Sequence, residues 1–384
     1  SSAASDVYKR QLRDEFEELL RSDEIAQVRT IQESYVNFYA EASTNPYVAL
    51  AADGPWIVTL KGAVLHDNGG YGMLGLGHVP ETVIEAMARP QVMANIMTSS
   101  VSQLRFAQAL RREIGHRRAD GCPFTQFACL NSGSEAVTLA ARLSDVNAKL
   151  LSDPGGRYEG RDARVIGLSH GFHGRTDRPA RFSDSSRRDY RRHLASFRGQ
   201  HDLIAVEPNN IQGLREAFDI VDREGAFVEA VILEPVMGEG NPGMAMDRAF
   251  YDAARVLTRE REGLLIIDSI QAGLRAHGCL SIVDYPGFED AAAPDAETFS
   301  KALNAGQYPL SVLAASGRAA DLYRTGIYGN TMTTNPRAMD VAVAVLDALT
   351  PELRANIRER GVEMADKLQA LAAELDGPIT GVQG

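Results

Sequence analysis

The 384-residue sequence has few cysteines and no long apolar run. Its three cysteines are odd in number and scattered, which favours reduced thiols in a cytoplasmic protein over a disulfide framework. No stretch has the apolar length that spans a bilayer, and no secretory hydrophobic segment stands near the start. The net charge of −11 argues against a general binder of phosphate backbones. We therefore expect neither a nucleic-acid partner nor a membrane partner.

Metal-ligand spacing is also missing from the sequence. Cys122 and Cys129 have no second pair and no histidine cluster nearby, and His170 and His173 have no evident third ligand. We therefore predict no metal site and interpret the two histidines as loop residues with satisfied hydrogen bonds.

The glycine-rich run from residue 69 to 77 lacks the strand–glycine–helix order of a dinucleotide site, so we interpret it as a loop near a cleft.

The length and composition suit a globular enzyme with one large and one smaller domain. Hydrophobic residues make up 44% of the chain and charged residues 24%. We expect a leader at 1–11, an N-terminal part of the small domain at 12–60, a large domain at 61–340 and the start of a C-terminal small domain at 341–384.

Strand and helix patterns alternate from about 120 to 315, which predicts an α/β fold with a largely parallel sheet. The strands are expected at 57–60, at 63–67 as the return of a hairpin, and at 124–130, 163–168, 228–233, 263–268 and 311–315. The strand at 124–130 is expected to be buried. Helices are expected at 12–42, from residue 81, and at 102–114, 248–262, 337–348 and 351–375. Residues 177–200, rich in arginine, are expected to form a solvated surface insertion.

An anion site is predicted where the strand ending at Leu130 meets the next helix. The connecting turn, Asn131-Ser132-Gly133-Ser134-Glu135, offers free N–H groups and a helix dipole that both favour a phosphate. The alternative is plain capping, with Ser132 as N-cap and Glu135 three residues on. The two interpretations are compatible.

Two further side chains follow predicted strands directly. Phe172 lies between glycines after the strand at 163–168, where an aromatic ring can lie flat on a planar ligand. Asp268 ends the most apolar strand, and a carboxylate at the carboxyl end of a buried strand faces a cleft in many α/β proteins. The alternative for Asp268 is an N-cap of the next segment.

Lys301 lies among small and apolar residues in Thr298-Phe299-Ser300-Lys301-Ala302-Leu303. An amine in such surroundings loses solvation, its pKa falls, and its neutral form reacts with aldehydes. Taken alone, the stretch is more simply interpreted as a loop with an exposed lysine. Together with the phosphate turn, the aromatic ring and the buried aspartate, it describes a holder for pyridoxal phosphate. Lys301 then binds the aldehyde and moves protons, and Asp268 pairs with the ring nitrogen.

Six motifs occur in order over most of the chain and resemble those of the class III aminotransferases, pyridoxal-phosphate enzymes of fold type I. They are Gly77-His78-Val79-Pro80, Asn131-Ser132-Gly133-Ser134-Glu135-Ala136, Phe172-His173-Gly174-Arg175-Thr176, Glu234-Pro235-Val236-Met237-Gly238-Glu239-Gly240, Asp268-Ser269-Ile270-Gln271-Ala272-Gly273 and Phe299-Ser300-Lys301-Ala302. Each motif alone is weak, whereas the ordered set is specific. The resemblance implies a central sheet of mostly parallel strands flanked by helices, with a smaller α+β domain.

The resemblance also implies roles for single residues. Lys301 forms the internal aldimine, and Asp268 forms a salt bridge to the pyridine nitrogen. The other expected cofactor contacts are Phe172 stacked on one ring face, Ile270 on the other, Gln271 at the ring hydroxyl, Gly133 and Ser134 at the phosphate, and Ser132, His173 and Glu234 nearby. Thr331 matches a threonine that family members lend to the partner's cofactor phosphate, which implies a homodimer.

The sequence departs from the family pattern at three places. Ser269 and Ala272 stand where the family usually has Glu and often has Thr. Asp268 and Lys301 are 301 − 268 = 33 residues apart, somewhat more than usual, and we place the extra length at 283–295. Family members continue past Gly384 by tens of residues, so we expect the small domain to be incomplete in this sequence.

The function implied is an aminotransferase with a ping-pong reaction, which moves an amino group from an amine or amino acid to a keto acid or aldehyde. An aminomutase, racemase or decarboxylase with the same cofactor is one alternative. A binding protein on an inactive transferase fold is the other. The identity of the amino donor stays open.

Overall fold

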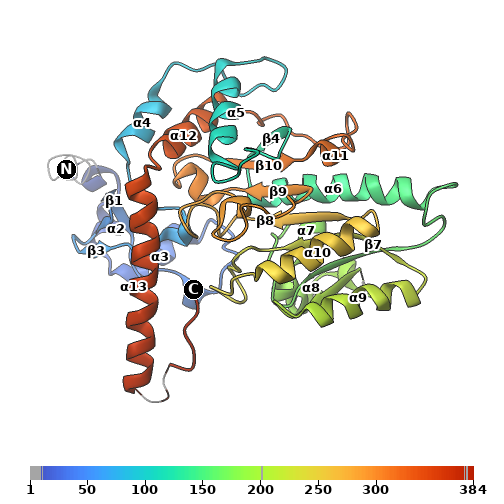
Figure 1. Cartoon of the computed structure of the whole chain (residues 1–384). Coiled ribbons are helices and arrows are strands. Elements are labelled where there is room, and N and C mark those ends of the chain that lie inside the picture. Colours follow the sequence, from blue (N-terminus) through green and yellow to red (C-terminus); the bar gives the residue numbers. More distant parts are fainter. Residues whose placement is uncertain (1–9, 11, 200–201, 376, 378) are drawn as a thin grey trace. The chain divides into compact units, whose positions relative to one another are not determined.

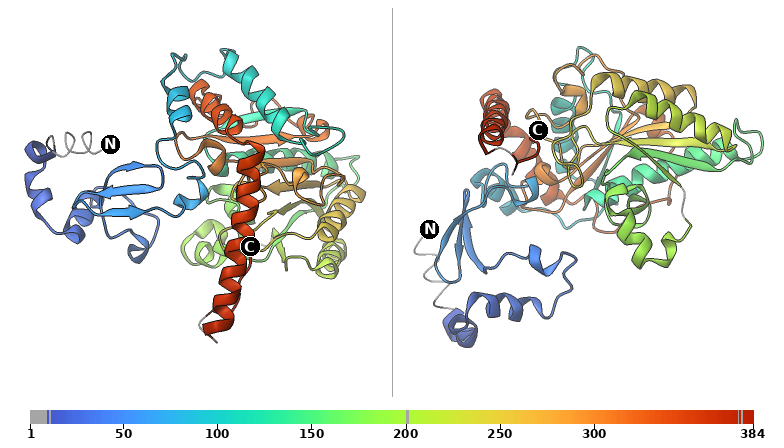
Figure 2. Two further views of the ribbon diagram at one scale, coloured as in Figure 1. Left: turned by 60° about the vertical axis from the view of Figure 1, so that its left-hand side comes forward. Right: turned by 90° about the horizontal axis from the view of Figure 1, so that it is seen from below.

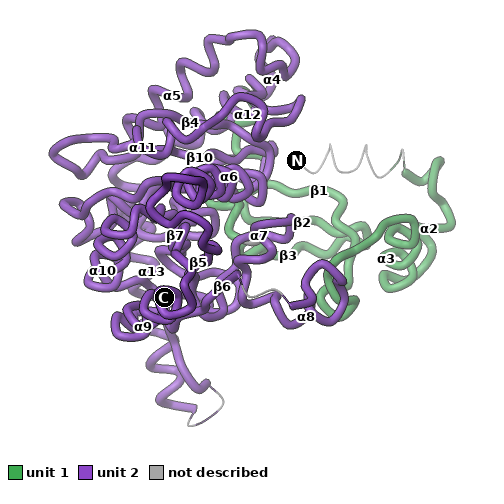
Figure 3. Tube along the Cα trace, turned by 90° about the vertical axis from the view of Figure 1, so that its right-hand side faces the viewer, with its two compact units in different colours: residues 1–85 green, residues 86–384 purple. Residues whose placement is uncertain are grey.

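The computed structural model describes residues 10, 12–199, 202–375, 377 and 379–384 (Figure 1). It forms two compact units, residues 1–85 and 86–384, which Figure 3 shows in different colours. The predicted leader lies outside the described residues except at its end. The predicted domain boundaries near 60 and 340 remain predictions. Among the described residues, no helix combines the length and apolarity needed to cross a bilayer.

The first unit carries a small antiparallel sheet in the order β1-β2-β3, made of β1 (Ala49–Asp53), β2 (Trp56–Thr59) and β3 (Val64–His66). The predicted hairpin at 57–67 is therefore confirmed. The predicted helix at 12–42 is wrong in its extent, because α2 (Glu17–Arg21) and α3 (Glu24–Gln32) are separate. Asp23 divides them: its side chain accepts a hydrogen bond from the N–H of Ala26 at 2.8 Å and so caps α3.

The second unit is built on a seven-stranded sheet in the order β4-β10-β9-β8-β7-β5-β6. Strands β9, β8, β7, β5 and β6 pair in parallel, whereas β10 is antiparallel to both of its neighbours. The prediction of a largely parallel sheet is confirmed. The strands are β4 (Gln126–Leu130), β5 (Ala163–Leu168), β6 (Leu203–Val206), β7 (Phe227–Leu233), β8 (Leu264–Asp268), β9 (Ala296–Phe299) and β10 (Ser311–Ala315).

The helices α6, α9, α10 and α11 contact this sheet, and most helices match the predicted ones within a few residues (Figures 1 and 2). They are α4 (Glu81–Ala88), which begins in the first unit, α5 (Val101–Glu113), α6 (Gly133–Ser152), α7 (Asp177–Phe182), α8 (Arg187–His193), α9 (Ile211–Arg223), α10 (Arg248–Glu260), α11 (Gly317–Ala320), α12 (Pro336–Asp347) and α13 (Pro351–Leu375). The arginine-rich insertion is thus partly helical, in α7 and α8. Short 3₁₀ turns connect these elements at η1 (Glu41–Ser43), η2 (Gly70–Gly72), η3 (Asp184–Ser186), η4 (Ala195–Phe197), η5 (Ile282–Asp284) and η6 (Lys301–Asn304).

The expectation that the strand at 124–130 is buried is wrong. Strand β4 lies at the edge of the sheet, and only its last residue, Leu130, is buried. Its apolar sequence suits either place, because edge position depends on the order of strands in space and not on local pattern.

The central strands are buried on both faces of the sheet. Ala230, Ile232 and Ile266 belong to the core that α6 covers, whereas α9 and α10 pack against β6, β7 and β8. Alternate residues of one strand face opposite sides, and Val231 and Ile267 are as fully buried as their neighbours. This double covering explains the continuous apolar runs that identify β7 and β8 in the sequence. It also leaves the strand ends as the place where polar side chains gather.

Candidate active site

Asp268 ends β8 and is buried, with three hydrogen-bond donors around its carboxylate. Oδ2 lies 2.9 Å from Nδ1 of His173. Oδ1 accepts from the hydroxyl of Thr298 at 3.0 Å and from the N–H of Ile270 at 3.2 Å. The last bond is the local capping contact that the alternative interpretation expects, so Asp268 both stabilises its turn and presents an oriented carboxylate.

His173 lies in the loop after β5 and is buried beside this carboxylate, so the interpretation as a hydrogen-bonded loop histidine is confirmed for Nδ1, with Asp268 as a partner distant in sequence. Burial opposes its charged form, but the hydrogen bond and charge of Asp268 and the charge of Glu234 outweigh burial and raise the pKa of His173. Its Nε2 has no hydrogen-bond partner within the described part of the chain. The ring nitrogen that faces Asp268 therefore carries the proton, because a carboxylate is a better acceptor than any group near Nε2.

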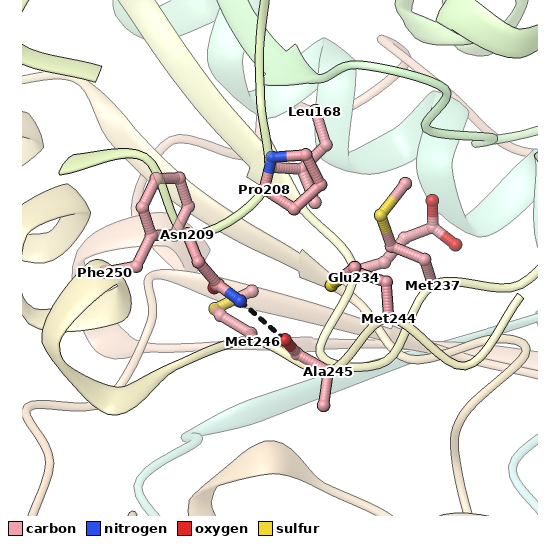
Figure 4. A pocket seen from close by; sticks show the side chains of 9 residues that line it. All are labelled: Leu168, Pro208, Asn209, Glu234, Met237, Met244, Ala245, Met246 and Phe250. Carbon is pink, nitrogen blue, oxygen red and sulfur yellow. Dashed lines mark hydrogen bonds between the residues drawn. The ribbon is translucent and has the colours of Figure 1, made fainter. Parts of the chain in front are cut away.

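Glu234 follows β7 and is packed against apolar side chains (Figure 4). Its carboxylate accepts hydrogen bonds from the backbone N–H groups of Phe172, at 2.9 Å, and Gly238, at 3.1 Å. Burial raises the pKa of Glu234 to about 7, although His173 and the two N–H donors lower it. The lining beside it consists of Leu168, Pro208, Asn209, Met237, Met244, Ala245, Met246 and Phe250. Glu234 thus fixes the two loops that bear Phe172 and Gly238.

The N-terminus of α6 has the geometry predicted for an anion site. Ser132 caps the helix, and Oε2 of Glu135 accepts from the N–H groups of Asn131 and Ser132, at 2.7 Å and 2.9 Å. The capping interpretation is therefore confirmed. The N–H groups of Gly133 and Ser134 donate to no acceptor among the described residues. These two donors, at the positive end of a 20-residue helix, remain available to an anion.

Close approach of backbone and side chains explains two glycines in the motifs. A Cβ on Gly133 would lie 2.8 Å from Cδ1 of Ile270, so Ile270 packs directly against the start of α6. A Cβ on Gly238 would lie 2.1 Å from Oε1 of Gln271. Ile270 and Gln271 are thus held between the α6 turn and the loop after β7, as the predicted cofactor contacts require.

Lys301 follows β9 and begins a 3₁₀ turn with φ of 48°, a left-handed conformation that is uncommon for lysine. Its side chain is half-buried, so the interpretation as an exposed loop residue is wrong. Burial lowers the pKa of Lys301, and the negative charges of Asp268 and Glu239 only partly oppose this. No hydrogen bond or ion pair joins its Nζ to the described residues. The amine is therefore more readily neutral than an exposed lysine would be.

Thr331 is exposed and lies in the loop between α11 and α12. The preceding residue ties this loop to the α6 turn, because Nδ2 of Asn330 donates to Oε1 of Glu135 and Nδ2 of Asn131 donates to Oδ1 of Asn330. The contact of Thr331 with another subunit remains a prediction.

The residues present fit pyridoxal phosphate. Unpaired donors at a helix N-terminus suit its phosphate, a buried and hydrogen-bonded carboxylate suits its basic ring nitrogen, and a desolvated amine suits its aldehyde. Ser134 lies in the first turn of α6, whereas Phe172 and Gln271 lie on the connections that follow β5 and β8. The stacking of Phe172 and the ring contacts of Ile270 and Gln271 stay predictions.

Sequence reasoning missed several groups at this site. Thr298 donates to Asp268 from the neighbouring strand, and its place in the motif beside Lys301 was the available signal. Arg175 lies with its guanidinium carbon 5.1 Å from the centre of the Phe172 ring and pairs with Glu239 at 3.0 Å. The motif Phe172-His173-Gly174-Arg175-Thr176 contained this arginine, but only the fold shows which carboxylate it meets.

Known proteins resemble this chain over most of its length. A family model described as aminotransferase class-III matches residues 38–383. An ornithine aminotransferase of Macrococcus caseolyticus is 28% identical over 338 residues, which cover 87% of this chain and 78% of that protein. A LysW-aminoadipate semialdehyde transaminase of Deinococcus radiodurans is 32% identical over 303 residues, which cover 79% of this chain and 64% of that protein. The fold matches that of a solved ornithine aminotransferase from Toxoplasma gondii that holds pyridoxal phosphate at partial occupancy, with a TM-score of 0.76 at 23% identity, over 96% of this chain and 80% of that one.

Proposed function

Because the chain belongs to the class III aminotransferases and is a pyridoxal-phosphate-dependent transaminase, we propose that Lys301 and Asp268 are its catalytic residues. The observation that carries this proposal is the pairing of β8 and β9. Asp268 is aligned with Thr298 in the parallel register, which brings the end of β8 next to the turn that carries Lys301. A buried, triply hydrogen-bonded carboxylate and a desolvated amine then occupy one end of the sheet.

Each residue has a distinct task in this proposal. When bound, pyridoxal phosphate supplies an aldehyde that combines with amines and a ring that withdraws electrons. Asp268, oriented by its hydrogen bonds with His173 and Thr298, would hold a proton at the ring nitrogen. Nζ of Lys301 accepts and returns the proton of the substrate carbon, a role that its lowered pKa favours. Gly133 and Ser134 bind the phosphate through their N–H groups, with Ser132 capping the helix behind them. Phe172, Ile270 and Gln271 orient the ring, and Glu234 holds the loop of Phe172.

We further propose that the amino donor is an amino acid with a terminal amine, and that the acceptor is a keto acid. The named relatives act on ornithine and on a semialdehyde of aminoadipate, which supports this class. Arg175 is a group that suits the substrate carboxylate, because it lies over the Phe172 ring and is partly exposed. Its ion pair with Glu239 would have to open or rotate when a carboxylate enters.

Absorbance spectroscopy with added pyridoxal phosphate tests the catalytic assignment. We expect a cofactor band that Lys301→Ala lacks and that Lys149→Ala, a change at an exposed lysine, retains. Ornithine should change the band, and a keto acid should restore it, because transamination runs in two reversible halves. A band that persists in Lys301→Ala would refute the assignment of that lysine. A band that no amine changes would favour another pyridoxal-phosphate reaction, and no band in any variant would favour a binding protein.

We also propose that the protein acts as a homodimer in which Thr331 reaches the partner's cofactor phosphate. Exposed apolar residues on one stretch support this: Val92, Met93, Ile96, Met97, Val101 and Leu104. The stretch borders a cavity of about 560 Å³ that Ile96, Phe127, Tyr323 and Tyr328 help to line. Gly329 and Thr333, on the loop of Thr331, line the same cavity. A contiguous exposed apolar surface of this kind is typical of an interface between subunits.

Mixing two inactive variants tests the trans contact. A dimer of one Lys301→Ala subunit and one Thr331→Ala subunit contains one complete site only if Thr331 acts across the interface. We expect the mixture to be more active than either variant alone. Activity equal to the average of the two variants would show that Thr331 serves its own subunit or no site at all.

We propose a cytoplasmic location on the basis of the thiols. Cys122, Cys129 and Cys279 are all free in the structure, and burial raises the pKa of Cys279 to about 11. Such thiols are typical of reducing compartments. Cell fractionation with an antibody to the protein tests the location.

A further inference from the structure

Glu297 is a buried carboxylate that the proposed mechanism does not use. It lies in the middle of β9 and is completely inaccessible to solvent. Its Oε1 accepts hydrogen bonds from the hydroxyl of Ser269 at 2.6 Å and from the N–H of Ile282 at 3.0 Å. Its Oε2 accepts from the hydroxyl of Ser281. One carboxylate thus joins the residue after Asp268 to the start of the 3₁₀ turn η5.

The position of Glu297 relative to Asp268 follows from strand geometry. Thr298 is aligned with Asp268, and Glu297 is aligned with Ile267. Neighbouring residues of a strand face opposite sides of the sheet, so Glu297 contacts β8 from the side opposite to Thr298. The backbone oxygen of Thr298 also accepts from the N–H of Ser269, at 3.0 Å. Strand β9 therefore fixes residues 268 and 269 through three hydrogen bonds, one on each face and one within the sheet.

Burying the Glu297 carboxylate costs folding free energy, which a residue that only fills space would not require. Burial and, to a smaller extent, the nearby charge of Asp284 raise the pKa of Glu297 to about 7, although the three hydrogen-bond donors lower it. Among the described residues, Cys122, Tyr251 of α10 and Tyr285 are further titratable side chains that interact with it, and all three have raised pKa values. An apolar residue of similar volume would avoid this penalty, because buried charges often stabilise a fold no better than hydrophobic side chains. The carboxylate therefore has a role other than stabilising the strand.

The contact of Glu297 with Ser269 indicates that role. The hydroxyl of Ser269, the residue directly after Asp268, donates to the Glu297 carboxylate of β9 at 2.6 Å. A carboxylate at position 269 and one at position 297 would reach the same buried space.

We propose that Glu297 is a positioning residue, which fixes through Ser269 the segment that carries Asp268, Ile270 and Gln271. The proposal rests on the assignment of Asp268 to the cofactor ring. Glu297 touches neither cofactor nor substrate, because it lies on the opposite face of the sheet from the Asp268 carboxylate.

Three variants test the proposal by titration with pyridoxal phosphate. Glu297→Val should weaken cofactor binding about tenfold, as loss of a hydrogen bond to a charged group does. Adding Ser269→Glu to the same chain should restore the dissociation constant to within about threefold, because it returns a carboxylate to the same space. Glu297→Gln should bind like the original protein, because its amide oxygen accepts from Ser269 and Ile282 while its amino group donates to Ser281.

The control is Glu229→Gln, at a buried carboxylate that bonds Ser144 and Arg178 away from the site. It should lower the unfolding temperature and leave the cofactor dissociation constant unchanged. Equal loss of cofactor affinity in Glu229→Gln and Glu297→Val would overturn the proposal, as would failure of Ser269→Glu to restore binding. If Glu297→Val does not fold, the other two variants decide. A folded Glu297→Val/Ser269→Glu protein that binds the cofactor normally supports the proposal. Weakened cofactor binding in Glu297→Gln overturns it. Failure of the active-site assignment itself shows separately, as a cofactor band that survives Lys301→Ala.

Discussion

The pH dependence of stability offers a direct test of how Glu297 is buried. Its pKa of about 7 in the folded protein compares with 4.5 for an ordinary glutamate. Below pH 4.5 the group is protonated in both the folded and the unfolded state. Between about 4.5 and 7 only the folded state keeps the proton, so unfolding releases it and stability falls as pH rises. Above about 7 the carboxylate is ionised in both states, and the loss is complete.

The magnitude follows from the shift in pKa. One unit corresponds to about 1.4 kcal/mol, so the shift costs about 3 kcal/mol of folding free energy at alkaline pH. Glu297→Gln removes this titration but keeps the side-chain shape and the hydrogen-bond acceptor for Ser269. The variant should therefore gain stability relative to the original protein, by about 3 kcal/mol, when the pH is raised from 4.5 to 7.5.

Urea unfolding of both cofactor-free proteins, at several pH values between 4.5 and 8, measures this difference. Glu234 titrates in the same range, but it is present in both proteins and its contribution cancels. A difference in stability that stays constant over this range would refute the reasoning. It would mean that Glu297 is ionised throughout and that its three donors overcome burial.

Three other changes have outcomes that the structure predicts. Thr298→Val, which keeps the volume but removes the donor to Oδ1 of Asp268, should weaken cofactor binding about tenfold in an absorbance titration and leave the fold intact. Asp295→Ala should destabilise the protein by about 3–5 kcal/mol in urea unfolding, because it leaves Arg255 buried without its partner at 2.6 Å; an unchanged midpoint would contradict this. Gly174→Ala places a Cβ 2.3 Å from Oγ of Ser134, at a position with a φ of 113°. The displaced hydroxyl should lower the ratio of the affinity for pyridoxal phosphate to the affinity for pyridoxal. An unchanged ratio would exclude a role for Ser134 in phosphate binding.

The sequence predicted the parts of this site that local pattern determines. Apolar runs that stop at Leu168, Leu233 and Asp268 identified the strand ends, because strands buried on both faces contain almost no polar residues. The α6 turn was equally clear, since a strand, a Ser–Gly–Ser turn and a glutamate three residues after the cap form a local signature.

Contacts between distant segments could not be predicted in this way. His173 and Asp268 are 95 residues apart, and only the order of strands brings them within 2.9 Å. Glu297 was overlooked because a charged residue inside a short strand contributes nothing to an apolar pattern. The edge position of β4 and the break between α2 and α3 were also not predicted, for similar reasons. Strand order is a property of the whole sheet, and Asp23 caps a helix within a sequence that otherwise has continuous helical spacing.

The conformation of Lys301 connects the fold to the chemistry. Lys301 and Ala305 both have left-handed backbone angles, with φ of 48° and 50°, and residues other than glycine adopt these at a cost of about 1–3 kcal/mol each. The turn keeps this strain because the hydroxyl of Ser300 donates to the carbonyl of Leu310 at 2.7 Å, which ties the turn to the start of β10. An unstrained turn would let the lysine extend towards water, where its charge is best solvated. The backbone instead holds the amine half-buried near Asp268, so the strain and the lowered pKa of Lys301 have the same structural origin.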